Sequence, residues 1–180
     1  MKLVDARKHR KEVKHLYITA FPKEERAPFW LLMSRVNNGR DSFYAVEDKG
    51  EFVGLVYTIR KEKLLYVFFL AVVEEKRGQG YGTRILCAMK KRNPGCVISL
   101  MIEDTDDTSA ENYEQRMQRL GFYQANGFQQ LHIKINEAGV DYELLGTETS
   151  VTQADFLALM KDYTGAWLYK FLYRKTVIEE

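Results

Sequence analysis

The sequence predicts a mixed α/β domain of the α+β-like kind, and three observations lead to this fold class. The chain has 180 residues, 46% of them hydrophobic, which is enough for one domain with a sizeable core and a short appendage. Residues 64–73 (LLYVFFLAVV) form an almost continuous apolar run of β-formers, which is typical of a central strand covered on both faces. Around this run, segments with helical spacing of apolar residues alternate with β-rich segments.

The first half of the chain predicts two helices, a hairpin and the central strand. One apolar stripe predicts a helix over residues 8–21, which Pro22 ends. A charged loop that runs to Pro28 then leads into a second helix over residues 29–36. A turn at residues 48–50 (DKG) joins strands that we expect at 42–47 and 52–59. The central strand follows this hairpin directly.

The second half predicts a helix over residues 83–91, a buried strand over 96–102 and a helix over 109–125. The last of these carries Tyr113, Met117 and Leu120 as its apolar stripe and ends at Asn126-Gly127. Strands are expected at 128–135 and 140–145, joined as a final hairpin. Thr152 is expected to cap a short helix through residue 160, and residues 163–175 fit either a helix or a strand.

The composition excludes several classes of protein. Lysine and arginine number 27 against 25 aspartates and glutamates, so the net charge is only +2 and we expect no nucleic-acid partner. No apolar run approaches the ~20 residues of a membrane-spanning helix. The first fifteen residues lack the apolar segment of a secretory signal, so we expect a cytoplasmic protein without a membrane partner. Cys87 and Cys96 lie in apolar surroundings and are expected to be buried structural thiols.

A glycine-rich turn, residues 78–83 (GQGYGT), connects the central strand to the next helix. Glycines at alternate positions allow successive backbone N–H groups to face one concavity without obstruction by a Cβ. The helix adds its unpaired N-terminal donors and the positive end of its dipole. The turn therefore predicts a phosphate or pyrophosphate site, with Arg77 at its rim.

Two nucleotide-binding motifs differ from this turn. A P-loop requires a Gly-Lys-Ser/Thr ending, which is absent here. The dinucleotide fingerprint G-x-G-x-x-G is nearly matched, and Glu103 stands about 20 residues further on as its acidic residue. However, Thr83 occupies the third glycine position, and too few strand–helix units follow the turn for a Rossmann sheet.

The turn and a second block resemble the GNAT acyltransferase superfamily. Leu70-Ala71-Val72 followed by Arg77-Gly78-Gln79-Gly80-Tyr81-Gly82 resembles its acetyl-CoA motif, Arg/Gln-x-x-Gly-x-Gly/Ala, which is matched at Arg77, Gly80 and Gly82. Residues 122–128 (FYQANGF) resemble the family's F-Y-x-x-x-G-F segment. The resemblance covers residues 1–147, so we predict a GNAT domain there and a C-terminal extension, 148–180, packed on the same domain.

The resemblance implies a central, mostly antiparallel sheet with a splayed central strand pair and flanking helices. It also implies acetyl-CoA as co-substrate, with backbone groups of residues 70–72 on the pantetheine arm and amides of residues 78–83 on the pyrophosphate. The acetyl group then passes to a primary amine by direct attack, without a covalent intermediate or a metal. The expected acetyl-CoA contacts are Leu70, Ala71, Val72, Arg77, Gly78, Gln79, Gly80, Tyr81, Gly82 and Thr83.

The resemblance also implies roles in proton transfer. Tyr123 matches the family's general acid, which protonates the departing CoA thiolate. Glu103, at the end of its strand, is the predicted base, directly or through water, and Glu24 and Glu25 are further candidates.

Many relatives carry Asn and Ala where this chain has Arg116 and Arg119, on the same helix face as Tyr123. These arginines are interpreted either as a cationic stripe for substrate or CoA, or as salt-bridge partners of the acidic residues 104–107.

The acceptor stays open between a small-molecule amine and a peptide amine. The resemblance places its wall at residues 23–30 (KEERAPFW) and 136–145, where Glu24 and Glu25 suit a cationic amine and Phe29 and Trp30 an apolar body. The alternative function is a non-catalytic CoA-binding sensor or pseudoenzyme. The aromatic tail 167–173 (WLYKFLY) is expected to pack back on the sheet or to form a homodimer contact.

Overall fold

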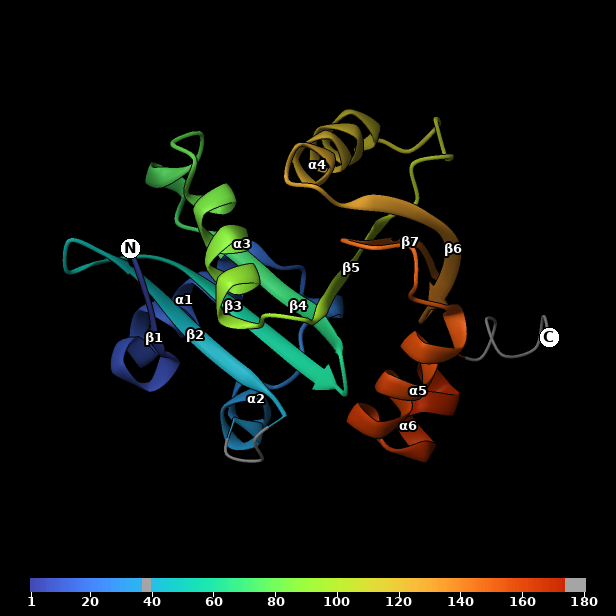
Figure 1. Ribbon diagram of the computed structural model, residues 1–180, viewed down its shortest axis with the longest axis horizontal. Helices are drawn as coiled ribbons and strands as arrows, with labels where there is room; N and C mark the ends of the chain where they lie inside the picture. Colours follow the sequence, from blue (N-terminus) through green and yellow to red (C-terminus); the bar gives the residue numbers. More distant parts are fainter. Residues whose placement is uncertain (37–39, 174–180) are drawn as a thin grey trace. The chain divides into compact units, whose positions relative to one another are not determined.

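The computed structural model describes residues 1–36 and 40–173, which fold as the predicted mixture of helices and strands (Figure 1). The described residues form seven strands: β1 (Lys2–Asp5), β2 (Ser42–Asp48), β3 (Glu51–Lys61), β4 (Leu64–Val72), β5 (Val97–Glu103), β6 (Gln129–Glu137) and β7 (Val140–Gly146). They also form the α-helices α1 (Arg10–Ala20), α2 (Phe29–Arg35), α3 (Tyr81–Arg92), α4 (Tyr113–Ala125), α5 (Gln153–Thr164) and α6 (Ala166–Leu172). Short 3₁₀ helices are η1 (Ala6–His9), η2 (Lys23–Glu25) and η3 (Glu74–Lys76).

The strands follow the hydrogen-bonded order β1-β2-β3-β4-β5-β7-β6. The pairs β1–β2, β2–β3, β5–β7 and β6–β7 are antiparallel, so the predicted mostly antiparallel sheet with flanking helices is confirmed. β5 begins beside the start of β4, where the Val97 N–H donates to the Lys63 carbonyl oxygen at 2.9 Å. The splay of the central strand pair stays a prediction.

The chain divides into two compact units. The first comprises Met1–Arg60 and Tyr66–Cys96, and the second comprises Lys61–Leu65 and the chain from Val97 onward. The described part of the C-terminal extension belongs to the second unit together with β5, β6 and β7. The domain boundary at residue 147 stays a prediction. No helix in residues 1–36 or 40–173 has the length and apolar character needed to cross a membrane.

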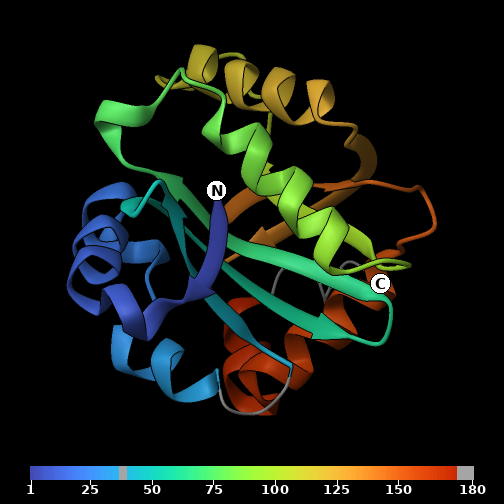
Figure 2. The ribbon, with the colours of Figure 1, turned by 60° about the vertical axis from the view of Figure 1, so that its left-hand side comes forward.

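In the first unit, helices cover both faces of the strands (Figure 2). Phe43 on β2 packs against Phe29 of α2 with ring centroids 6.0 Å apart, and Phe29 in turn lies 6.1 Å from Tyr17 of α1. The next residue of β2, Tyr44, accepts a hydrogen bond at 3.2 Å from Arg92 of α3. Because successive strand residues point to opposite faces, α3 covers the face opposite α1 and α2.

In the second unit, the predicted N-cap of α5 is confirmed as a capping box. The Asp155 N–H donates to Thr152 Oγ1 at 3.1 Å, and the Thr152 N–H donates to Asp155 Oδ2 at 3.0 Å. The ambiguous tail is helical (α6) up to Leu172. It packs against the β6–β7 turn, because the buried Tyr173 donates its hydroxyl to Glu137 at 3.0 Å and the Ala138 N–H donates to the Leu172 carbonyl at 2.8 Å.

Several element predictions were wrong in detail. β1 was not predicted, because a four-residue strand at a sheet edge carries too few alternating residues to be recognised. α4 begins at Tyr113 instead of residue 109, since the Asp107 carboxylate accepts from the backbone and hydroxyl of Ser109 and holds that segment as a turn. Met117, expected on the apolar stripe, is 39% exposed, whereas Leu120 is buried.

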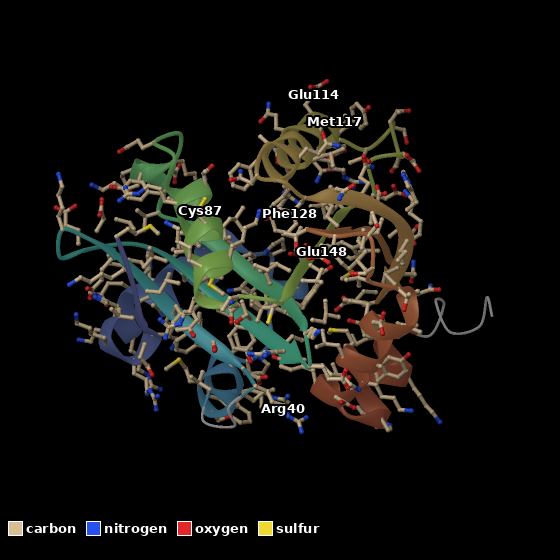
Figure 3. The ribbon with its side chains drawn as sticks, in the orientation of Figure 1. Arg40, Cys87, Glu114, Met117, Phe128 and Glu148 are labelled. Carbon is tan, nitrogen blue, oxygen red and sulfur yellow. The ribbon has the colours of Figure 1, made fainter. Side chains whose placement is uncertain are left out.

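The prediction that both cysteines are buried was also wrong. Cys87 is exposed on α3 (Figure 3), and Cys96 is partly exposed. The buried stripe of α3 is formed by Ile85, Leu86 and Met89, so the side chain of residue 87 points away from the core.

Gly54 marks a close approach of two backbones in the first unit. A Cβ at residue 54 of β3 would lie 2.5 Å from the Ala71 carbonyl oxygen and 3.4 Å from the Val72 Cα of β4. These atoms belong to the strand end that precedes the glycine-rich turn. Only a residue without a Cβ fits there unless β4 shifts.

We therefore predict that Gly54→Ala lowers the free energy of unfolding by about 1–3 kcal/mol, as overpacking does in closely packed interiors. Gly121→Ala on α4 is the control, because its Cβ meets nothing within 4 Å and alanine favours a helix by up to about 1 kcal/mol. Urea unfolding at pH 7 measures the free energy of unfolding of both variants and of the parent. A Gly54→Ala protein as stable as the parent would contradict the close approach.

Candidate active site

The glycine-rich turn has the backbone conformation that its glycines allow. Gly78 has φ +71° and Gly80, the N-cap of α3, has φ +76°, both in the left-handed region. A Cβ built on either residue would meet nothing within 4 Å. The space within 4 Å of these two Cβ positions is therefore clear of protein atoms other than the neighbouring residues, which favours a close approach of a ligand to this backbone.

The start of α3 carries backbone donors without acceptors. The first hydrogen bond of the helix runs from the Arg84 N–H to the Gly80 carbonyl at 3.1 Å. Among the described residues, no acceptor is found for the N–H groups of Tyr81, Gly82 and Thr83, and no side chain caps the helix. Three free donors at the positive end of a helix form a site for an anion of phosphate type.

Asp48, the last residue of β2, anchors this end of α3. Its carboxylate accepts hydrogen bonds from Arg84 Nη1 and Nη2 at 3.1 and 3.0 Å and from the Tyr81 hydroxyl at 3.0 Å. The pKa of Asp48 lies well below its usual range, chiefly because of the Arg84 guanidinium. Tyr81, expected as an acetyl-CoA contact, thus uses its hydroxyl as an anchor, whereas its backbone N–H has no acceptor in the described residues.

The side chains of Arg77 and Gln79 bind backbone carbonyl oxygens that precede the turn, at the end of β4 and in η3. Arg77 Nε donates to the Val72 carbonyl oxygen at 3.3 Å, and Gln79 Nε2 donates to the Glu75 carbonyl oxygen at 2.8 Å. Leu70 and Val72 are partly exposed, whereas Ala71 between them is buried. The end of β4 is joined to the turn through η3, and all three lie in the first unit.

Glu103, the predicted base, ends β5 in the second unit, where its carboxylate has three partners. Asn112 Nδ2 donates to Oε1 at 2.8 Å, Arg119 Nη1 donates to Oε2 at 2.8 Å, and Arg116 Nη2 lies 3.5 Å from Oε1. Burial raises the pKa of Glu103, but the hydrogen bonds from Asn112 and Arg119 outweigh it and hold this pKa below its usual range. Glu103 is therefore ionised at neutral pH and fastens β5 to α4.

This arrangement decides the partners of the two arginines. Arg119 pairs with Glu103, and Arg116 donates to the Asp104 backbone carbonyl at 2.7 Å. The carboxylates of Asp104 and Asp106 bind Lys134 instead. The arginines are therefore salt-bridge partners, as one of the two interpretations expected. Their carboxylate partner is Glu103 and not a member of the acidic cluster 104–107.

Tyr123, the predicted acid, lies in the last turn of α4. Its ring packs edge-on against Phe122 and Phe128 with centroid distances of 5.1 and 5.6 Å. Within the described residues its hydroxyl has no hydrogen-bond partner, and burial raises its pKa against the smaller, opposite effect of Arg119. The hydroxyl therefore keeps its proton at neutral pH, which a general acid requires.

The predicted site residues thus form two groups, one in each unit. The glycine-rich turn and residues 70–72 lie in the first unit, and Glu103 and Tyr123 share Arg119 as a neighbour in the second. Asp48 and Arg84 were not predicted as site residues, because no local sequence pattern links residues 36 positions apart. Within the described residues, no cluster of three His, Cys, Asp or Glu side chains is suited to a metal ion.

The predicted acceptor wall is only partly open. Phe29 packs into the aromatic core of the first unit, whereas Trp30 is 67% exposed. Glu25 is exposed, and the side chain of Glu24 lies outside the part of the chain that the structure describes.

Comparisons with known proteins agree with this geometry. The family "Acetyltransferase (GNAT) domain" matches residues 39–130, a range that contains both the glycine-rich turn and the Tyr123 block. The chain is 27% identical over 112 residues to "Putative acetyltransferase YjbC" of Bacillus subtilis (strain 168). That match covers 61% of this chain and 58% of the relative, so it spans less than two thirds of the relative's length.

Solved structures share the fold at low sequence identity. A GNAT-family protein from Bacteroides thetaiotaomicron has a TM-score of 0.73 at 18% identity, over 93% of this chain and 97% of that one. An aminoglycoside 6'-N-acetyltransferase complexed with coenzyme A has a TM-score of 0.63 at 17% identity, over 85% and 99%. A spermidine N-acetyltransferase SpeG chimera from Vibrio cholerae and hSSAT has a TM-score of 0.59 at 16% identity, over 83% and 97%. The family match covers half of the chain and these structures share its fold, so the chain belongs to the GNAT acetyltransferase family.

Proposed function

We propose that the protein transfers the acetyl group of acetyl-CoA to a primary amine, carried by a small molecule or a peptide. The observation that supports this most is the set of free amides at the open glycine-rich turn, which suits the CoA pyrophosphate. One structural relative is an aminoglycoside acetyltransferase with coenzyme A bound, and another is a spermidine acetyltransferase, so amine acceptors occur among proteins of this fold.

Each group of site residues has a defined task in this reaction. Acetyl-CoA supplies the acetyl group as a thioester, whose carbonyl carbon forms the C–N bond with the amine as its C–S bond breaks. Residues 78–83 bind the pyrophosphate through their amides, and residues 70–72 align the pantetheine arm along β4. Tyr123 gives its hydroxyl proton to the departing sulfur, and Glu103 takes the amine proton through water.

A second candidate is a CoA-binding sensor without transferase activity. It is favoured by the partners of Glu103, because a carboxylate already held by Asn112 and Arg119, with a lowered pKa, is a weak base. The cytoplasmic location and a homodimer through the C-terminal segment also stay proposals, the latter supported by Trp167, which is 83% exposed on α6.

For the glycine-rich turn we predict that Gly80→Val weakens CoA binding, because its side chain enters the space that the pyrophosphate needs. Loss of one charge-assisted hydrogen bond corresponds to a Kd that is about tenfold to a hundredfold higher. Gly95→Val is the matched control, since Gly95 has φ +74°, equal free space within 4 Å and a place at the other end of α3. Calorimetric titration with CoA measures both. Equal Kd values for the two folded variants would refute the assignment of the turn.

For Tyr123 we predict that Tyr123→Phe lowers kcat about 10²–10⁴-fold, the usual range of general acid catalysis, and leaves the affinity for acetyl-CoA nearly unchanged. The hydrogen bond to the sulfur develops only as the C–S bond breaks. An acetyl thioester with a more acidic thiol therefore reduces the difference in kcat between Tyr123→Phe and the parent. Tyr113→Phe, at the first residue of α4, is the control for loss of a hydroxyl. A parent-like kcat for Tyr123→Phe with acetyl-CoA would exclude Tyr123 as the acid.

Two variants separate a base from an anchor at Glu103. If Glu103 is the base, Glu103→Gln lowers kcat far more than Arg119→Gln, which removes the anchor but keeps the carboxylate. If Glu103 only fastens β5 to α4, the two variants lower kcat and stability alike.

The stability of the parent also depends on Glu103. Its folded pKa is lowered, so its contribution is complete above the unfolded value of about 4.3 and is lost as the pH falls through the folded pKa. The stability difference between parent and Glu103→Gln is therefore constant from pH 5 to 7 and shrinks below about pH 4. Urea unfolding across pH checks this, and a difference that grows in acid would contradict the ionic anchor.

A further inference from the structure

Arg26, which follows η2 in the connection between α1 and α2, has an unusual environment. Its Nε is covered by protein atoms and has no hydrogen-bond partner, the one buried side-chain nitrogen or oxygen in this condition among the described residues. Its Nη1 donates to the Ile18 carbonyl oxygen at 3.2 Å. Among the side chains that the structure describes, no carboxylate forms an ion pair with this guanidinium. A buried donor without an acceptor costs free energy, and a rotation that brings this donor to an acceptor on a bound ligand removes the cost.

The position of Arg26 is fixed from both sides. The Arg26 N–H donates to the Lys23 carbonyl at 3.4 Å, and the next residue, Ala27, accepts a hydrogen bond from the Tyr17 hydroxyl of α1 at 2.9 Å. These contacts hold the backbone at Arg26 next to α1, whereas the guanidinium itself is held by one hydrogen bond, so the side chain can rotate without disturbing the backbone.

The same segment of chain covers β4 beside the predicted acetyl-CoA arm. Phe21, the C-cap of α1, packs edge-on against Phe69 of β4 at 4.9 Å, and Tyr17 packs edge-on against the same ring at 5.0 Å. Phe69 directly precedes Leu70, where the pantetheine arm is expected to begin its contact. The segment that carries Arg26 is thus connected, through Tyr17 and Phe21, to the layer that packs on β4 at Phe69, within the first unit.

From this placement we propose that Arg26 binds a carboxylate on the amine acceptor, which makes amino acids and peptides with a free carboxylate the preferred substrate class. The inference rests on the proposed acetyl transfer. With Nη1 already engaged, the Nε–Nη2 edge offers two parallel donors, the geometry that a carboxylate accepts in a bidentate manner. Nε is covered, so a carboxylate reaches it only after the side chain rotates.

Two other roles for Arg26 give different results in experiment. A guanidinium on the Ile18 carbonyl also caps the C-terminal end of α1, and a cap alone affects stability without any preference among acceptors. The second role is contact with a CoA phosphate, because phosphates share the same hydrogen-bond chemistry. That role predicts a weaker affinity for CoA in Arg26 variants and no preference between acid and amide acceptors.

The experiment compares acceptors that differ only in a carboxylate against a carboxamide, namely amino acids and dipeptides with their C-terminal amides. For the parent we expect kcat/KM to favour the acids by about tenfold to a hundredfold, the ratio that a hydrogen-bonded charge provides. Arg26→Gln removes the preference through KM with kcat retained, and Arg26→Lys keeps only part of it because lysine lacks the paired donors. Lys14→Gln, which removes an exposed cation from α1, leaves the preference unchanged.

A binding measurement decides the question independently of activity. Hydroxy acids and their amides lack the nucleophilic amine, and we measure the shift in melting temperature that each causes in the presence of CoA. A shift for the acids that Arg26→Gln abolishes, with an unchanged Kd for CoA, supports the assignment even if no amine is acetylated. Two results overturn the assignment of Arg26. One is a parent with equal kcat/KM and equal melting-temperature shifts for acids and amides, and the other is an Arg26→Gln variant that keeps the parent's preference for acids.

Discussion

Backbone amides at the start of α3 need an acceptor that the described part of the protein does not supply, and the functional interpretation depends on this constraint. Tyr81, Gly82 and Thr83 begin a helix whose N-cap is a glycine in the left-handed region, so no side chain reaches back to cap them. An uncapped helix start costs stability unless a ligand or water satisfies it. An anion of pyrophosphate type satisfies all three donors and the helix dipole at once.

The surrounding structure keeps this turn open and in place. Asp48 binds Arg84 and Tyr81 from the end of β2, which fixes the first turn of α3 without using the free amides. Gly54 allows β4 to approach β3 closely just before the turn, where a Cβ would meet the Ala71 carbonyl oxygen. In the second unit, Glu103 and Arg119 connect β5 to the helix that carries Tyr123 in the same way, by an ion pair between a strand end and a helix.

Features that depend on neighbouring residues were predicted from the sequence. The apolar run of β4, the turn at residues 78–83 and the Thr152 cap are local patterns, and the structure has each of them within a few residues of its expected place. Features that depend on residues far apart were not. Asp48 with Arg84 and Gly54 with Ala71 are pairs whose contact is evident only after the chain has folded. Cys87 shows a related limit, because apolar neighbours in sequence do not decide which face of a helix a residue occupies.

The most direct test of the central claim is a titration of the labelled protein with CoA, followed by the backbone amide resonances. The amides of residues 78–83 are expected to shift in a saturable manner with a common Kd, because they bind the pyrophosphate. The amides of Gly95 and Gly121, one at the far end of α3 and one on α4, are expected to shift little. Saturable CoA binding that leaves the resonances of residues 78–83 unchanged would contradict the proposed site.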